Sequence, residues 1–204
     1  MKTALIVVDL QNEFLNGKMK LPHLDNIVKK INEIQHKFDI VCFTKNITQQ
    51  EKNVEIKKDN IKISDSGHFC IEGTDGSELI KELNINDNIF IRNYDENLSI
   101  SNSKNIENKN LIDFLKENGV THTFLCGSNS DYTIRYSQID LLKDFKSYIL
   151  IDLLKTIYLL DKFVNYLVQN KLPFTNTLLL DKMLKGINTP VGKMENKYNK
   201  KTKS

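Results

Sequence analysis

The sequence lacks any long hydrophobic run. None of its 204 residues belongs to an apolar stretch near the roughly 20 residues that a membrane-spanning helix needs, so we expect no membrane association. The apolar run at residues 4–8 stops at Asp9. It is too short for the core of a signal peptide and predicts a buried strand instead. We therefore expect a cytoplasmic protein.

Cysteine is scarce, and the net charge is close to zero outside the last residues. The three cysteines form no CxxC pair, which favours free buried thiols over disulfides or a metal cluster. The net charge is +3, but residues 193–204 hold five lysines and one glutamate, so the rest of the chain carries about −1. We expect no nucleic-acid partner. The predicted organisation is one domain over residues 1–185 and a basic, flexible tail over residues 186–204.

Short apolar runs alternate with segments of helical period along the chain. This alternation predicts an α/β fold of three layers, a doubly wound, mainly parallel six-stranded sheet with helices on both faces. Residues 45–75 are polar and predict an irregular excursion or disorder. The predicted strands are residues 4–8, 39–44, 88–91, 121–126, 147–151 and 174–179. The predicted helices are residues 24–38, 76–83, 109–118, 131–143 and 156–170, with Gly119 ending the third.

The fold class indicates where a site would lie. In open parallel sheets, ligands bind beyond the carboxyl ends of the strands, near the point where strand order reverses. Asp9 ends the first predicted strand and is a candidate proton acceptor, or simply a turn or cap residue. Residues 124–134 pass from strand to helix through small polar residues. Such an elbow aims backbone N–H groups at an anion, although Ser130 or Asp131 capping a helix is the alternative.

Four motifs, in order, resemble those of the nicotinamidase and isochorismatase-like hydrolases of the cysteine hydrolase superfamily. Residues 9–14 read Asp-Leu-Gln-Asn-Glu-Phe and are similar to the opening motif of that family. Residues 70–76 resemble its Cys-x-x-Gly-Thr-x-Gly segment, and residues 127–134 resemble its nucleophile elbow. Residues 137–140 and 149–152 fall where the family has Thr-Ala-x-Asp and a strand that ends in aspartate. The resemblance spans about residues 3–180.

The resemblance implies a role for each matching position. The family uses an aspartate, a lysine and a cysteine, and backbone N–H groups of the elbow hold the oxyanion. The aspartate corresponds to Asp9, and the elbow positions are Ser128 and Asn129. The resemblance also implies that substrate contacts the side chains Gln11, Phe14 and Tyr132.

The chain departs from the family at two of the three catalytic positions. The nucleophile position holds Thr133, whose hydroxyl is much harder to activate than a thiol. The lysine position holds Arg92, a planar fork that keeps the positive charge but exchanges no proton and can pair with Asp9. We therefore expect amidase activity to be lost or altered.

The family's metal ligands are also replaced. Asn46 and Thr48 stand where the family has Asp-x-His, and Phe69 stands where a further ligand histidine precedes the cysteine. An amide, a hydroxyl and a phenyl ring do not make a transition-metal site. We therefore expect no metal cofactor.

The leading hypothesis is a family member that binds a small aromatic amide or carboxylate, or serves as a subunit of an assembly. Two alternatives remain open. One is an isochorismatase-like enzyme in which Asp9 donates a proton and Arg92 attracts a carboxylate substrate. The other is nicotinamide hydrolysis with Thr133 as the nucleophile, activated by Asp9. By resemblance to the family, we expect a homo-oligomer.

Overall fold

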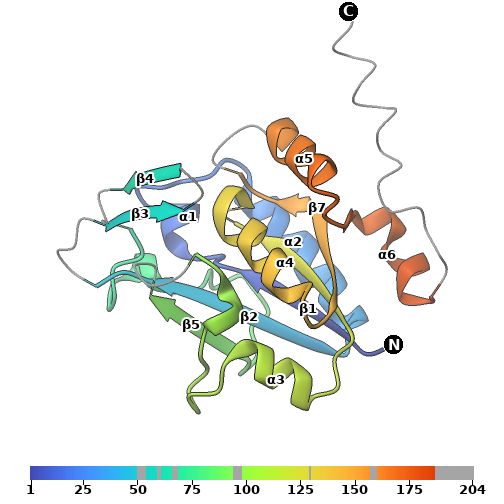
Figure 1. Cartoon of the computed structure of the whole chain (residues 1–204). Coiled ribbons are helices and arrows are strands. Elements are labelled where there is room, and N and C mark those ends of the chain that lie inside the picture. The colour runs from blue at the N-terminus through green and yellow to red at the C-terminus, as the bar shows by residue number, and fades with distance from the viewer. Residues whose placement is uncertain are drawn as a thin grey trace, which may run out of the picture.

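The computed structural model describes residues 1–49, 54–58, 61–65, 69–93, 98–128, 130–156 and 160–186. These residues form a six-stranded sheet between two layers of helices, together with a separate two-stranded hairpin (Figure 1). The prediction for residues 187–204 of the tail lies outside the described residues. No described helix is long and apolar enough to cross a membrane.

All neighbouring strands of the large sheet run parallel, in the order β5-β2-β1-β6-β7-β8. The predicted fold class is therefore confirmed, with a sheet that is entirely parallel. The chain builds outward from β1 on one side, then returns to pair β6 against its other edge. The strands are β1 (Thr3–Val8), β2 (Ile40–Ile47), β5 (Ile89–Asn93), β6 (His122–Gly127), β7 (Lys146–Leu154) and β8 (Phe174–Thr175).

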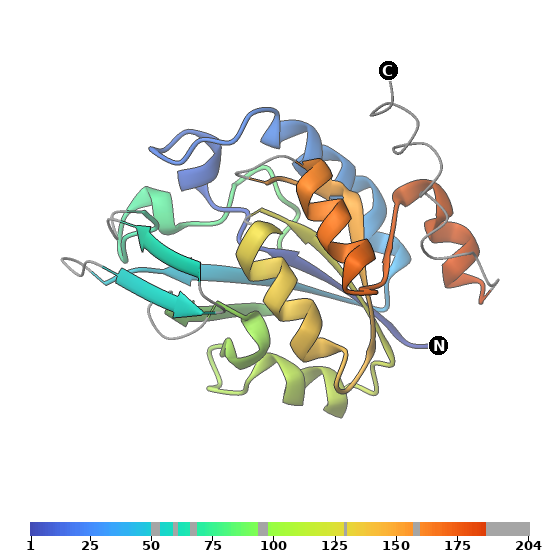
Figure 2. The same ribbon diagram turned by 45° about the horizontal axis from the view of Figure 1, so that its top comes forward.

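Two hydrophobic clusters fill the space on either side of the sheet. Alternation along β1 sends Leu5 and Val7 into the cluster that packs under α2, and Ile6 and Val8 into the cluster that packs under α3, α4 and α5. Figure 2 shows α2 behind the sheet and α4 in front of it. The α-helices are α1 (Asn12–Leu15), α2 (Leu24–Ile34), α3 (Leu111–Glu117), α4 (Arg135–Leu141), α5 (Leu160–Gln169) and α6 (Thr177–Leu184).

Short helical turns join these elements. Gly119 ends α3 as predicted: it has a φ of +67°, and the amides of Gly119 and Val120 bond back to carbonyls of the last helical turn. A π-helical turn at Ser130–Ile134 leads into α4. The 3₁₀ turns are Gln35–Lys37, Asp75–Ser77 and Ile100–Asn102.

Three sequence predictions need correction. Residues 45–75 are not irregular throughout, because β2 continues to Ile47 and an antiparallel hairpin follows, β3 (Val54–Lys58) with β4 (Ile61–Asp65). Residues 76–83 do not form a helix beyond the 3₁₀ turn, since residues 78–80 run extended against the loop that follows β1. Residues 174–179 are a strand for only two residues, because Asn176 accepts a hydrogen bond from the amide of Leu179 and caps α6.

The reversal of strand order falls between β1 and β6, and their carboxyl ends are in close contact. Gly127, the last residue of β6, has a φ of +123°, and a Cβ added there would overlap the carbonyl oxygen of Val8. Glycine at this position is therefore required both by the backbone conformation and by the space available. The residue after β1 and the residue after β6 are thereby held side by side.

We predict that Gly127→Ala lowers the free energy of unfolding by about 3 kcal/mol or more, because strain and overlap act together. Gly119→Ala is the matched control, since its φ of +67° is also left-handed but nothing lies within 4 Å of an added Cβ. It should cost about 1–2 kcal/mol. Urea denaturation of both variants measures the difference, and equal losses would show that the contact with Val8 does not constrain Gly127.

Candidate active site

Asp9 lies directly after β1, at the point where strand order reverses. Its side chain is fully buried, and its backbone has a φ of +49°, a left-handed conformation that aspartate tolerates better than most residues. Thr44 on β2 donates to the Asp9 Oδ1 at 2.7 Å and accepts from the Asp9 amide at 3.2 Å. These two bonds fix the direction of the carboxylate. The contact of Thr44 with Asp9 depends on the register of β1 and β2, which local sequence does not show.

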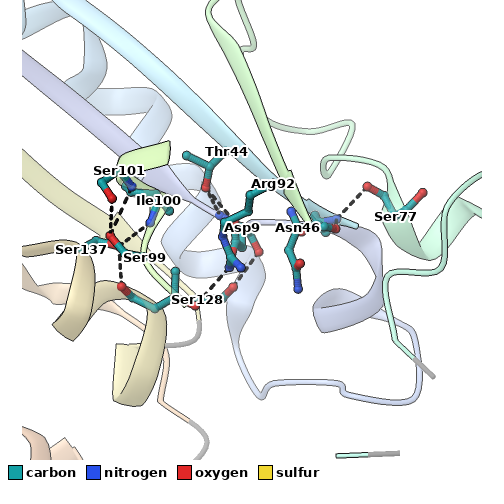
Figure 3. A network of polar contacts seen from close by, with 12 residues as sticks. Asp9, Thr44, Asn46, Ser77, Arg92, Ser99, Ile100, Ser101, Ser128 and Ser137 are labelled. Atoms are coloured by element: carbon teal, nitrogen blue, oxygen red, sulfur yellow. Dashed lines mark hydrogen bonds and ion pairs between the residues drawn. The ribbon is translucent and has the colours of Figure 1, made fainter. Parts of the chain in front are cut away.

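Arg92 on β5 reaches across β2 to the same point (Figure 3). Its Nη2 donates to the Asp9 Oδ2 at 2.5 Å and to the Thr133 Oγ1 at 3.1 Å. The side chains of Arg92 and Asp9 are 3% and 0% exposed, and Thr133 is also fully buried. The structure thus brings together three residues that lie far apart in the sequence.

The ion pair between Asp9 and Arg92 is shielded from water, which raises the energetic cost of losing either partner. Removing both charges from water is costly, and each compensates the other only while both are present. A carboxylate left alone in this position would be an uncompensated buried charge. The pair therefore makes the positions of β1 and β5 interdependent across the intervening strand β2.

Thr133 lies in the π-helical turn Ser130–Ile134, a type of irregularity that is frequent at functional sites. Its carbonyl accepts a hydrogen bond from the Ser137 Oγ, and the same Oγ accepts from the amide of Ile100 at 3.0 Å. Ser137 therefore joins the turn that carries Thr133 to the residues after β5. It was recognised only as part of a family motif, because its contact with Ile100 is not visible in local sequence.

A second set of polar contacts joins the same two segments. The Ser101 Oγ donates to the Asp140 Oδ2 at 3.2 Å, and Lys143 donates to the Asp140 Oδ1 at 2.8 Å. Burial tends to raise the pKa of Asp140, but hydrogen bonds from Lys143, Ser99 and Ser101 outweigh it and hold that pKa below its usual value. Asp140 is therefore ionised at neutral pH and helps to fix α4 relative to the turn at Ile100–Asn102.

The predicted elbow lies where expected, but Ser128 does not offer a free donor. Its amide donates to the carbonyl of Val8 at 2.9 Å, and its Oγ donates to the carbonyl of Asp9 at 2.6 Å. Both donors thus brace the end of β1, and an oxyanion contact by Ser128 is not supported by this geometry. The other predicted elbow residue, Asn129, lies outside the described residues.

The three residues predicted to contact substrate have different surroundings. The Gln11 Nε2 donates to the carbonyls of Asn46 and Ser77, at 2.8 and 2.7 Å, so its amide braces neighbouring backbone. Phe14 is buried in the core, with its ring centroid 6.5 Å from that of Phe69. Tyr132 is half-buried beside Thr133. Their roles toward substrate stay predictions.

The positions of the family's metal ligands lie on β2, directly after β2, and after β4. Asn46 is fully buried and Thr48 is 1% exposed, while Phe69 belongs to the hydrophobic core. These side chains offer one amide oxygen and one hydroxyl, neither of them charged, which does not fit a transition metal. Within the part of the chain that the structure describes, no group of three or more histidine, cysteine, aspartate or glutamate residues could hold a metal ion.

The three cysteines are free and buried, as predicted. Burial raises the pKa of Cys42 to about 12 and raises the pKa values of Cys70 and Cys126 beyond the usual range. The negative charges of Asp9 and Glu13 raise the pKa of Cys70 further. Because thiolates are the reactive form, burial makes all three thiols poor nucleophiles.

The polar side chains lie after the strands of a parallel α/β sheet, and the sequence matches one family. The model of the isochorismatase domain matches residues 3–159, and the chain belongs to this family. It is 28% identical over 174 residues to a nicotinamidase of Acinetobacter baylyi, with 76% of this chain and 81% of the relative covered.

The chain is also similar to a second relative and to a solved structure. A protein of Arabidopsis thaliana named a probable inactive nicotinamidase is 26% identical over 147 residues, covering 68% of this chain and 71% of that protein. The crystal structure of pyrazinamidase of Pyrococcus horikoshii in complex with zinc superimposes with a TM-score of 0.67 at 23% identity. It covers 86% of this chain and 99% of that chain, and at that identity it supports the fold alone.

We predict that Arg92→Met lowers the free energy of unfolding by about 3–5 kcal/mol, because it leaves the Asp9 carboxylate buried without its partner. The double variant Asp9→Asn/Arg92→Met should regain most of this loss. Lys37→Met is the control, since the pair between Lys37 and Asp181 is partly exposed and should contribute about 1 kcal/mol or less. Urea denaturation measures all three, and a double variant no more stable than Arg92→Met would argue against charge as the cause.

We also predict that iodoacetamide leaves all three thiols of the folded protein unmodified at mildly alkaline pH. Their raised pKa values and their burial both suppress the thiolate. Intact mass after alkylation, with a urea-denatured sample as the positive control, gives the count. Modification of the native protein would show that at least one thiol is more accessible than its buried position indicates.

Proposed function

We propose that this chain is an isochorismatase-family protein in which the amidase chemistry of the nicotinamidases is lost or altered. In this proposal it binds a small aromatic amide or carboxylate, or acts as a subunit of an assembly, and it uses no metal. A homo-oligomer and a cytoplasmic location are part of the proposal. It is supported by one observation above all, the contact of a single guanidinium nitrogen with both Asp9 and Thr133.

The contacts of Arg92 and Thr44 with Asp9 disfavour both the removal of a proton from the nucleophile and the activation of Thr133. A proton acceptor must reach the proton of the nucleophile, but the two carboxylate oxygens of Asp9 already accept from Thr44 and Arg92. Arginine cannot relay the proton, because it does not lose its own at accessible pH. A threonine hydroxyl, unlike a thiol, needs a strong activating base before it attacks a carbonyl. The arrangement therefore supports binding better than acyl transfer.

The ion pair between Arg92 and Asp9 also disfavours the isochorismatase-like alternative. There, Arg92 would attract a carboxylate substrate, but its positive charge is already balanced by Asp9 at 2.5 Å. A second anion entering this site would meet a pair with no net charge. A neutral amide meets no such penalty, which favours an amide as the ligand.

We predict that the purified protein releases no ammonia from nicotinamide above the buffer background. Thr133→Cys/Arg92→Lys should restore measurable release, because it supplies a thiol nucleophile and a cation that exchanges a proton. Thr133→Ser/Arg92→Lys is the matched control, which keeps a hydroxyl and should remain inactive, since losing a nucleophile costs at least about a thousandfold in rate.

A coupled assay for free ammonia measures all of these variants. Release by the unmodified protein, abolished by Asp9→Asn, would establish an active hydrolase and overturn the proposal. If the double variant folds but stays inactive, the site no longer positions an amide, and only the assembly role survives.

A further inference from the structure

Two buried polar side chains, one on β2 and one directly after it, have no hydrogen-bond partner within the described protein. The Oδ1 and Nδ2 of Asn46 and the Oγ1 of Thr48 make no hydrogen bond, although both residues are almost completely shielded from water. Buried polar groups are hydrogen-bonded in the great majority of cases, so each exception calls for an explanation. Here two exceptions lie two residues apart, at the end of β2 and directly after it.

The backbone groups of Asn46 and Thr48 are already hydrogen-bonded, so they cannot serve as partners for these side chains. The amide of Asn46 donates to the Gln11 Oε1 at 2.9 Å, and its carbonyl accepts from the Gln11 Nε2 at 2.8 Å. The amide of Thr48 donates to the carbonyl of Cys70, and its carbonyl accepts from the amide of Glu72, both at 3.0 Å. All four backbone groups are therefore occupied.

The two side chains share a face of the sheet with the ion pair. Side chains two apart in extended backbone point the same way. The chain stays extended past the end of β2 to a bridge between Thr48 and Ile71, so Thr44, Asn46 and Thr48 form one row. Asn46 is the register partner of Arg92, and Thr44 bonds to Asp9. Figure 3 shows the Asn46 carboxamide extending from its strand on the side where Arg92 and Asp9 lie.

We propose that Asn46 and Thr48 form a neutral hydrogen-bonding subsite that holds an uncharged polar group of a small ligand, such as a carboxamide. The inference rests on the proposed binding function and names the ligand group that the site selects. Because the side chains are shielded from solvent, the ligand reaches them when neighbouring side chains move aside. The carboxamide of Asn46 offers both donors and an acceptor, which matches another amide on its hydrogen-bonding edge.

The charges of the site disfavour two other classes of ligand, divalent cations and carboxylates. A divalent cation needs anionic or imidazole ligands, and this row offers one amide oxygen and two hydroxyls. A carboxylate needs an uncompensated positive charge, but the nearby guanidinium is already paired with Asp9. A neutral group needs only hydrogen-bond partners, and the unpartnered atoms of Asn46 and Thr48 can provide them.

Asn46→Leu separates a binding role from a structural one. It replaces an unpartnered amide with an apolar group of similar size, so we expect the melting temperature to rise by about 2–4 °C. The affinity for nicotinamide, measured by isothermal titration calorimetry, should fall about tenfold or more. Thr48→Val should weaken binding in the same direction.

Thr123→Val is the matched control. The Oγ1 of Thr123 is also buried without a partner, but it lies near the opposite end of the sheet, at the start of β6. This variant should keep the melting temperature or raise it, and leave the affinity for nicotinamide unchanged. A fall in affinity here would show that binding merely follows the stability of the sheet, and would overturn the inference.

The remaining outcomes separate the subsite from the proposed function. If the unmodified protein binds nicotinamide and Asn46→Leu binds it equally well, the subsite is wrong and the binding function stands. If the unmodified protein binds neither nicotinamide nor nicotinate, both fall. Tighter binding of nicotinate than nicotinamide, or saturable binding of zinc chloride that Asn46→Leu abolishes, would also overturn a neutral subsite.

Discussion

The buried pair between Asp9 and Arg92 is the interaction on which the rest of the site depends. It joins the residue that follows β1 to β5, two strands away, and the same guanidinium bonds the hydroxyl of Thr133 after β6. Three strand ends thus share one charge-compensated centre. In a low-dielectric interior this arrangement is rigid, because any displacement separates opposite charges that water cannot solvate.

This centre is built on the framework of the isochorismatase family, to which the chain belongs. The parallel sheet, the elbow after β6 and the carboxylate after β1 match the family to which the chain belongs. What the geometry adds is that Arg92 contacts both Asp9 and Thr133 directly. An arginine that satisfies both Asp9 and Thr133 fills the centre with contacts that a reacting group would need for itself.

Much of this could be predicted from sequence, and the failures have clear causes. The strands that precede Asp9 and Thr133 and the strand that carries Arg92 were predicted because apolar runs ending in polar residues are local signals. The extended course of residues 78–80 was missed because it depends on pairing with the loop after β1, and the hairpin β3–β4 was missed because its segment is polar. The bracing roles of Ser128 and Gln11 were equally invisible, since each depends on backbone groups distant in sequence.

The central position of β1 has a consequence for synthesis of the chain. All six of its residues are buried, and it pairs with β2 on one edge and with β6 on the other. During translation, β2 and β5 emerge first, but the second edge stays open until His122–Gly127 leave the ribosome. An apolar strand with an unsatisfied edge is a template for intermolecular pairing. The nascent chain is therefore most exposed to aggregation in the interval before β6 emerges.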